Sequence, residues 1–443
     1  STVTVQGQSQ ETQVGDASKE VAPVSRGTLT KSQLEKFVGL DSAVTGALKY
    51  LPGVHVSGGD NSGITEGGLN IRGFSQDQIG FVRDGIPLND PQFLTPHADF
   101  MGDPENYESV SVLYGSSSIN APTLTASGGS VLIKSVAPTR ESGLLVKQNV
   151  GSDSLFRTFA RVNTGEVNGF SAWLSASRTT ADLWDNSGGE LSSNRYEGNL
   201  QYEWDGNRIN GLFSSFLMRT NSYNHPTLAE YRANKYDQGY PRDIYPTKGN
   251  GTNGVPDVTV PGQSAAASRA DFKIQTYALN GLFNLSDKVQ LKVDPYFVRV
   301  TDGTAAVAVV PVNENKVNAD LNGDGDSIDP LVTGALSVYP TQYRFGSTNT
   351  LDFLVNDDHT LQLGLWTDYT HARNQFPVVE IKGNGKPAGI DGSHKLRDGN
   401  GNAIYYTDQR NEITTQKLWV QDTWDITSQL VLTGGLAWQH TQN

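Results

Sequence analysis

Leu51-Pro52-Gly53-Val54 opens a series of five short stretches, between residues 51 and 134, that determine the fold of this part of the chain. The other four are Ile71-Arg72-Gly73-Phe74, Val82-Arg83-Asp84-Gly85-Ile86-Pro87-Leu88, Glu108-Ser109-Val110-Ser111-Val112-Leu113-Tyr114-Gly115 and Gly128-Gly129-Ser130-Val131-Leu132-Ile133-Lys134. Short apolar runs alternate there with glycines, and Gly73 and Gly85 permit tight backbone turns. The residues just before, Thr30 to Leu51, carry apolar side chains near helical spacing. These patterns predict a small mixed α/β domain.

A different pattern begins at Gly143. Segments of about ten residues or more alternate between apolar and polar side chains, which is the period of a β-strand with two unlike faces. They are longer than the five or six residues typical of strands in soluble sandwiches, and nearer the roughly 9 to 11 that cross a bilayer obliquely. We expect about eleven strands, near residues 143–150, 154–163, 168–180, 194–204, 208–220, 269–284, 288–300, 341–355, 359–373, 412–425 and 429–441.

The connections between these segments alternate between tight and long. Tight connections occur at Asp205-Gly206-Asn207, Leu285-Ser286-Asp287, Asn356-Asp357-Asp358 and Ile426-Thr427-Ser428, whereas residues 221–268, 301–340 and 374–411 form long ones. Outer-membrane barrels have short periplasmic turns and long external loops. The long connections are therefore expected to lie outside the cell.

Composition agrees with this interpretation and excludes other classes. The 443 residues include no Cys and two Met, the formal net charge is -13, and the mean hydropathy is -0.43. No apolar run approaches the roughly 18 residues of a transmembrane helix, so a closed barrel with a polar interior is the remaining way to span a membrane. The negative charge argues against a nucleic-acid partner. Enzyme signatures such as a P-loop or His-Glu-x-x-His are absent, and we expect no catalytic residues and no required cofactor.

The five quoted pieces, in that order and spacing, resemble the plug domain of a TonB-dependent outer-membrane receptor or transporter. The resemblance implies a membrane β-barrel of the antiparallel, 22-stranded type with a small α/β plug domain in its lumen. It divides the chain into a flexible N-terminal segment (residues 1–27), a plug (28–140) and the N-terminal part of the barrel (141–443). About eleven strands are an odd number, and plugged transporters have about 22. We therefore expect the remainder of the barrel to come from missing sequence or from another chain.

The same resemblance implies a function in the bacterial outer membrane. TonB would provide energy from the periplasm for active import of a scarce ligand, with a ferric siderophore as the default substrate. The alternatives are a non-iron ligand such as cobalamin, an oligosaccharide or an aromatic compound. A surface binding or adhesion protein built on a plugged barrel is another class.

Residues for TonB contact and for the plug are carried over from the family. The start of the chain, Ser1, Thr2, Val3, Thr4 and Val5, is similar to the TonB box, although a frayed terminus would read the same way. Arg72 matches a plug arginine that faces carboxylates on the barrel wall. A second such arginine is expected in Leu-Arg-Gly-Pro, but this sequence has Leu113-Tyr114-Gly115-Ser116 instead.

Candidate ligand-binding residues occur in two stretches. The region where the family presents an apical plug loop contains polar, aromatic and sulfur side chains, and residues 221–268 are rich in Tyr and Arg, which recur at recognition surfaces. A lone loop His is also commonly solvated and idle. The predicted set is Gln92, Phe93, His97, Met101, Tyr223, His225, Tyr236 and Arg242.

One further motif indicates a cation. Asp320-Leu321-Asn322-Gly323-Asp324-Gly325-Asp326 matches the start of an EF-hand-like loop, with oxygen ligands at positions 1, 3 and 5 and Gly at position 6. Leu331 stands where the twelfth-position Glu is usual, and Asp329 is a late carboxylate in its place. The motif predicts a structural Ca²⁺ bound by Asp320, Asn322, Asp324, Asp326 and Asp329, with a solvated acidic turn as the alternative.

Overall fold

The computed structural model divides the chain into two compact units, one of residues 1–97 and 103–136 and the other of residues 98–102 and 137–443. The residues it describes are 25–37, 45–57, 62–64, 67–91, 94–96, 101–115, 117–184, 189–221, 227–234, 253–255, 268–301, 304–330, 332–381, 387–389, 393–427 and 430–443.

The first unit is a small α/β domain with two sheets. Its larger sheet has the order β1-β7-β8-β5-β6, and β5 and β8 are parallel while the other neighbours are antiparallel. Those strands are β1 (Arg26–Thr30), β5 (Ile79–Arg83), β6 (Ile86–Pro87), β7 (Tyr107–Tyr114) and β8 (Gly129–Ser135). The smaller sheet joins β2 (Val54–Ser57), β3 (Gly68–Ile71) and β4 (Phe74–Ser75). Short helices α1 (Lys31–Phe37) and α2 (Thr45–Leu48) and 3-10 turns η1 (Gln76–Gln78) and η3 (Pro104–Asn106) complete it.

Alternating apolar side chains of the larger sheet form the core of this unit. Phe81, Val110, Val112 and Val131 are fully buried, as is Leu48 of α2. Burying one such side chain contributes about 1.5–3 kcal/mol. The helix predicted before Leu51 is present as two short helices.

Glycine turns join the short strands, as the sequence predicts. Arg72 and Gly73 both have positive φ (49° and 87°) in the turn between β3 and β4, and Asp84 and Gly85 (49° and 84°) do the same between β5 and β6. Two consecutive residues with positive φ are the signature of the turn that matches the twist of a two-residue hairpin. The Asp84 side chain also accepts a 2.9 Å hydrogen bond from the Ser135 backbone amide, which ties the turn to β8.

Arg72 and Tyr114 form a contact within this unit. The Arg72 guanidinium lies 4.5 Å from the centre of the Tyr114 ring, and its Nη2 donates a 3.4 Å hydrogen bond to Ser25. The Tyr114 backbone amide donates to the Ser25 carbonyl at 2.9 Å. The contact therefore connects the β3–β4 turn with β7 and with the start of β1. Partial burial raises the pKa of the Tyr114 hydroxyl, so the ring is neutral beside the cation.

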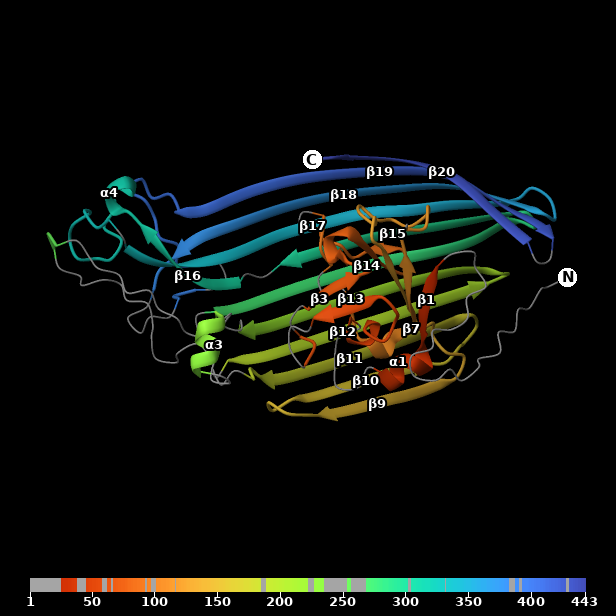
Figure 1. Ribbon diagram of the computed structural model, residues 1–443, viewed down its shortest axis with the longest axis horizontal. Helices are drawn as coiled ribbons and strands as arrows, with labels where there is room; N and C mark the ends of the chain where they lie inside the picture. Colours follow the sequence, from red (N-terminus) through yellow and green to blue (C-terminus); the bar gives the residue numbers. More distant parts are fainter. Residues whose placement is uncertain are drawn as a thin grey trace. The chain divides into compact units, whose positions relative to one another are not determined.

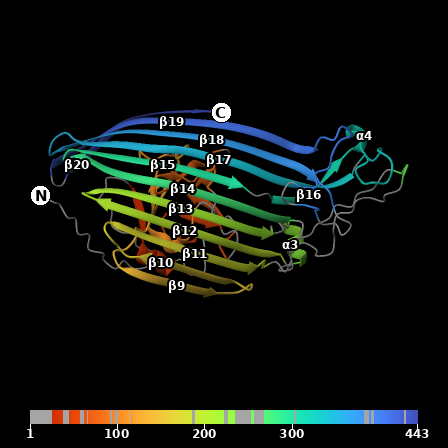
Figure 2. The ribbon, with the colours of Figure 1, turned by 180° about the vertical axis from the view of Figure 1, so that it is seen from behind.

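The second unit is one antiparallel sheet of twelve strands within the described residues, and Figures 1 and 2 show the long strands side by side. Its main path runs from β9 to β20 in chain order except for β16, which pairs with β14 and β17. The strands are β9 (Ser142–Val150), β10 (Phe156–Thr164), β11 (Phe170–Asp182), β12 (Glu190–Trp204), β13 (Asn207–Asn221), β14 (Ser268–Ser286), β15 (Val289–Thr301), β16 (Thr304–Val312), β17 (Val332–Leu354), β18 (His359–Val379), β19 (Tyr405–Thr427) and β20 (Leu430–Gln442). Helices α3 (Leu228–Asn234) and α4 (Glu314–Val317) lie at the same end of the sheet in Figure 1.

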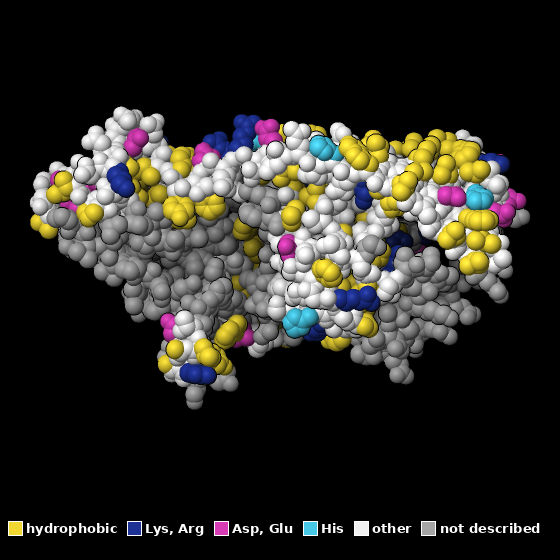
Figure 3. Space-filling model, turned by 45° about the horizontal axis from the view of Figure 1, so that its top comes forward, with side chains coloured by type: hydrophobic (Ala, Val, Ile, Leu, Met, Phe, Trp, Pro, Cys, Tyr) yellow, Lys and Arg dark blue, Asp and Glu magenta, His cyan; other side chains and the backbone are white. Residues whose placement is uncertain are grey.

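Burial in this sheet is the reverse of that in a soluble protein. On β11 the exposed residues include Phe170 and Leu174 (52% and 68% exposed), whereas Ser171, Ser175 and Thr179, which point to the opposite face, are buried. The face with exposed apolar side chains is called the outer face below, and the opposite face the inner face. Figure 3 shows many exposed hydrophobic side chains on a face that includes β18 to β20. An exposed apolar face of this extent marks a surface that contacts lipid or another apolar partner. None of the described helices is long and apolar enough to cross a membrane.

All eleven predicted strands are present. The alternation of the sequence did not predict β16, and three of the strands are longer than predicted. β17 begins at 332 rather than 341, β18 ends at 379 rather than 373, and β19 begins at 405 rather than 412. These extensions pair with one another and with β16. They also frame a separate apolar cluster of Val312, Leu321, Val332, Val378 and Leu396. Long-range packing of this kind stabilises strands that have no clear period of two.

Replacing Tyr114 with Ala should loosen the β3–β4 turn, because an exposed cation–π contact contributes about 0.5–1 kcal/mol. We expect amide hydrogen exchange at residues 68–75 of the intact protein to accelerate about two- to fivefold. Tyr114→Phe is the matched control, since it retains the ring and the Tyr114 hydroxyl has no hydrogen-bond partner among the described residues. Equal acceleration by Ala and Phe would contradict a role for the ring.

Candidate functional site

The inner face of the second unit carries charged and amide side chains that are buried. Arg161 of β10 and Glu197 of β12 both lie opposite Ser175 of β11 in the strand register. The three residues therefore occupy one row across three strands. Further inner-face residues on these strands with charged or amide side chains and at most 7% exposure are Arg157, Arg195, Asn199 and Gln201. A wall of this kind presents donors and acceptors to whatever polar group or water lies against it.

A second inner-face group centres on Asp368 of β18. Arg344 of β17 donates through Nε to the Asp368 carboxylate at 2.7 Å, and both side chains are nearly inaccessible. The Tyr296 hydroxyl donates to the same carboxylate and accepts a 3.0 Å bond from the Trp366 indole N–H. A buried carboxylate needs such partners to remain charged. The Asp368 carboxylate thus has three polar neighbours, and these residues include no nucleophile and base in the geometry of a catalytic triad.

The predicted acidic loop follows α4 and folds around its own carboxylates. Asp320 accepts backbone hydrogen bonds from Gly323 (2.6 Å), Asp324 (3.2 Å) and Gly325 (2.9 Å). Gly323 and Gly325 have φ of 82° and 105°, so glycine is required at both positions. Asp324 accepts from the Asp326 amide through Oδ1, while its Oδ2 is buried without a hydrogen-bond partner among the described residues.

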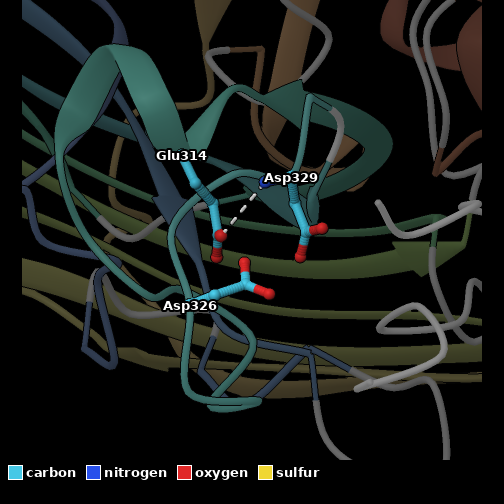
Figure 4. Close-up of side chains that lie close together, drawn as sticks. All are labelled: Glu314, Asp326 and Asp329. Atoms are coloured by element: carbon cyan, nitrogen blue, oxygen red, sulfur yellow. Dashed lines mark hydrogen bonds between the residues drawn. The ribbon is translucent and has the colours of Figure 1, made fainter. Parts of the chain in front are cut away.

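Three carboxylates converge in this loop (Figure 4). Potential ligand atoms of Glu314, Asp326 and Asp329 all lie within 4.8 Å of one another, and Glu314 and Asp329 are fully buried. Asn322 donates to Asp329 at 2.7 Å. Asp326 and Asp329 belong to the predicted set, but Glu314 was missed because it precedes the motif and comes from α4. In the sequence, Glu314 is recognisable only as an acidic residue that follows a helix-capping residue. That residue is Asn313, whose side chain accepts a hydrogen bond from the Lys316 backbone amide.

Electrostatics make this cluster unfavourable without a cation. Burial raises the pKa of Glu314, and the nearby Asp329 raises it further, while backbone amides of Leu321 and Asp329 lower it. Like charges at this distance repel, and all-oxygen ligand sets at the surface are the preference of Ca²⁺.

Two features hold the acidic loop in place. The apolar cluster that contains Leu321 packs beneath it, together with Val317 and Ala319 at its edge. Asn253 donates to the Gly325 carbonyl at 3.3 Å, and the Gly254 amide donates to the Asp326 carboxylate. Residues from the long connection between β13 and β14 therefore contact the loop between β16 and β17.

Most of the predicted recognition residues lie outside the described residues. This applies to Ser1 to Val5 and to the ligand candidates Gln92, Phe93, His97, Tyr223, His225, Tyr236 and Arg242. Met101 is described and is 2% exposed. Arg72 is exposed and contacts Tyr114, as described above. The roles assigned to all of them stay predictions.

Known proteins resemble this chain in its plug domain and in its fold. Residues 18–129 match the family model of the TonB-dependent Receptor Plug Domain. A search of curated protein sequences gave no match. Among solved structures, the chain resembles the ferric citrate transporter FecA in its unliganded form, with 14% identity, a TM-score of 0.67, and coverage of 95% of this chain and 56% of FecA.

Two other structures show the same likeness. The copper transporter OprC has 13% identity and a TM-score of 0.63, with 97% of this chain and 56% of OprC covered. The siderophore receptor PiuA from Acinetobacter baumannii has 14% identity and a TM-score of 0.60, with 97% and 61% covered. The chain thus spans little more than half the length of these proteins. Residues 18–129 thus match a TonB-dependent receptor plug domain, and the chain shares the plug-plus-strand fold of these structures.

Proposed function

We propose that the protein imports a scarce ligand across the bacterial outer membrane with energy supplied by TonB. The observation that carries the proposal is the presence, in one chain, of the matched plug domain and of a sheet with an apolar outer face and a polar inner face. The outer face suits lipid, because each unpaired backbone group in hydrocarbon costs several kcal/mol and paired strands expose none.

A ferric siderophore is the default substrate. FecA is named as a ferric citrate transporter and PiuA as a siderophore receptor, whereas OprC is named as a copper transporter. Identities of 13–14% support the shared fold and leave the ligand open. Cobalamin, an oligosaccharide and an aromatic compound are therefore the alternative substrates, and a surface binding or adhesion role is the alternative function.

The proposed energy-coupling contact uses Ser1 to Val5. Alternating β-branched residues favour an extended backbone, which pairs as an added strand with a partner sheet. Such a contact depends on main-chain hydrogen bonds more than on particular side chains.

Deleting residues 1–7 should separate binding from import. We expect energised uptake of the ligand to fall to the level of a strain without TonB, while binding at the cell surface is retained. Radiolabelled uptake and binding on intact cells measure the two quantities side by side. A deletion of residues 7–13, which leaves the proposed contact intact, is the control. Normal uptake by the first variant would exclude this contact, and surface binding without any TonB-dependent uptake in the wild type would favour the adhesion alternative.

We also propose that the acidic loop binds a structural Ca²⁺. Glu314, Asp326 and Asp329 would supply carboxylate oxygens, and Asp320, Asn322 and Asp324 of the predicted set complete the loop around them. The charge of the ion would compensate the mutual repulsion of buried carboxylates, and it would stiffen the loop and the segment bonded to Asp326.

Calorimetry on the purified protein should detect binding with a dissociation constant of about 0.1–1 mM, the range of extracellular calcium modules. Glu314→Gln combined with Asp329→Asn should abolish the binding heat and make proteolysis near residues 313–330 independent of calcium. Asp398→Asn is the control, because Asp398 is an exposed loop carboxylate that caps the Asn400 and Asn402 amides at 2.9 and 2.8 Å. If the wild type gives no binding heat and calcium does not change its proteolysis, the loop is an acidic turn only.

A further inference from the structure

Three side-chain amides on the inner face of β12 and β13 have buried oxygen atoms. Asn199 Oδ1, Gln201 Oε1 and Asn210 Oδ1 have no hydrogen-bond partner among the described residues. Asn199 and Gln201 are 4% and 7% exposed, so little of either side chain is open to bulk solvent. A buried acceptor without a donor is unfavourable, and native proteins supply a partner for nearly all of them. The three oxygens therefore indicate a bound group that interacts with acceptors.

The strand register brings the three amides together. Gln201 lies directly opposite Asn210 of β13, and on its other side it lies opposite Ser171 of β11. Asn199 is two residues from Gln201 and is therefore on the same face. Directly opposite residues have Cβ atoms about 4.5–5.5 Å apart, and residues i and i+2 of a strand are about 7 Å apart. Three amide oxygens and one hydroxyl can therefore surround a single small group.

The charged residues beside this group of amides come in pairs of opposite sign. On one side Glu197 occupies the same row as Arg161, and on the other side Arg208 lies opposite Glu203. The amides and the hydroxyl between them are neutral. The arrangement therefore offers several oxygen atoms without a carboxylate among them.

Neutral oxygens of this kind suit an ion of low charge. Ca²⁺ sites draw on carboxylates, and the number of charged ligands sets their affinity. Potassium ions, in contrast, are bound by neutral carbonyl oxygens that replace the hydration shell of the ion. A monovalent cation therefore fits the donor set better than a divalent one.

We propose that Asn199, Gln201 and Asn210 bind a monovalent cation, K⁺ or Na⁺, with the Ser171 hydroxyl as a fourth oxygen ligand. The ion interacts with the amide oxygens in place of hydrogen-bond donors, and it links β11, β12 and β13 through their inner-face side chains. The site is separate from the acidic loop, whose carboxylates suit Ca²⁺. It does not depend on the identity of the imported ligand.

Thermal unfolding of the complete protein in detergent micelles tests the site. The midpoint is measured in KCl, NaCl and choline chloride at the same ionic strength of about 0.15 M, so that screening of surface charges is equal in all three. Choline is too large for three amides on adjacent strands to enclose. An ion that binds only the folded state stabilises it by mass action, so we expect a midpoint about 2 °C or more higher in KCl or NaCl than in choline chloride.

Two variants change the oxygen ligands in opposite directions. Asn199→Leu combined with Gln201→Met nearly conserves side-chain volume and removes two oxygens. This variant should melt at the same temperature in all three salts, and in choline chloride no lower than the wild type, because it has lost acceptors that are unsatisfied there. Gln201→Glu adds a charged ligand, which should lower the half-saturating KCl concentration by about threefold or more.

Gln290→Leu is the matched control. Gln290 is an inner-face amide of β15 whose nitrogen already donates to Asn284 Oδ1 at 2.9 Å. Its replacement should leave the wild-type difference between KCl and choline chloride unchanged. Loss of this difference in the control as well as in the double variant would contradict a specific site.

The remaining outcomes decide between an ion and water. A wild-type midpoint that is the same in KCl, NaCl and choline chloride overturns the proposal and leaves water as the donor to the three oxygens. A double variant that keeps the wild-type difference overturns it too. Crystals of the wild type soaked in rubidium chloride need no variant, so they decide the question if the double variant fails to fold. Anomalous density between the three amide oxygens supports the site, and its absence contradicts it.

Discussion

Backbone hydrogen bonding is the constraint on which the second unit depends. Its outer face exposes Leu, Val, Phe and Tyr side chains, and these are stable only where the backbone beneath them needs no water. Long antiparallel strands meet this requirement, since every strand between β9 and β20 on the main path has partners on both sides. The inner face is then free to carry Arg, Glu, Asn and Gln without loss of the lipid-facing surface. The polar inner face and the apolar outer face are thereby separated by a single layer of backbone.

Local patterns in the sequence predicted most of this architecture because each signal was short-range. A period of two gave the strands, and Arg72-Gly73 and Asp84-Gly85 gave the hairpin turns, since positive φ is a property of those residues themselves. The extensions of β17 to β19 were missed because their stability comes from β16 and from Val312, Val332 and Val378, which lie far apart in sequence. Glu314 was missed for the same reason: the chain folds back through Leu321 before its carboxylate meets Asp326 and Asp329.

Tyr114 differs from the arginine that the resemblance implies at this position, and the difference changes several contacts. Where the resemblance implies a second arginine, this chain places an aromatic ring that lies beneath Arg72 and next to Gly27, whose added Cβ would lie 3.0 Å from the Tyr114 hydroxyl. An arginine there would put two cations side by side and remove the ring face. The tyrosine therefore fits a plug in which the Arg72 guanidinium is positioned by contacts within the domain itself.

Charged groups at the ends of the long strands differ from those on the inner face in the partners that surround them. Inside the sheet, Asp368 is satisfied by Arg344 and Tyr296, so its charge is compensated by neighbouring strands. In the acidic loop, Glu314 and Asp329 are buried with other carboxylates nearby; Glu314 accepts from the backbone amides of Leu321 and Asp329, and Asp329 accepts from Asn322. At the outer rim, Asp182 and Glu190 face each other across a ladder whose like charges repel. The strand register that pairs the backbone of β11 and β12 therefore also brings the carboxylates of Asp182 and Glu190 to the same position on the sheet.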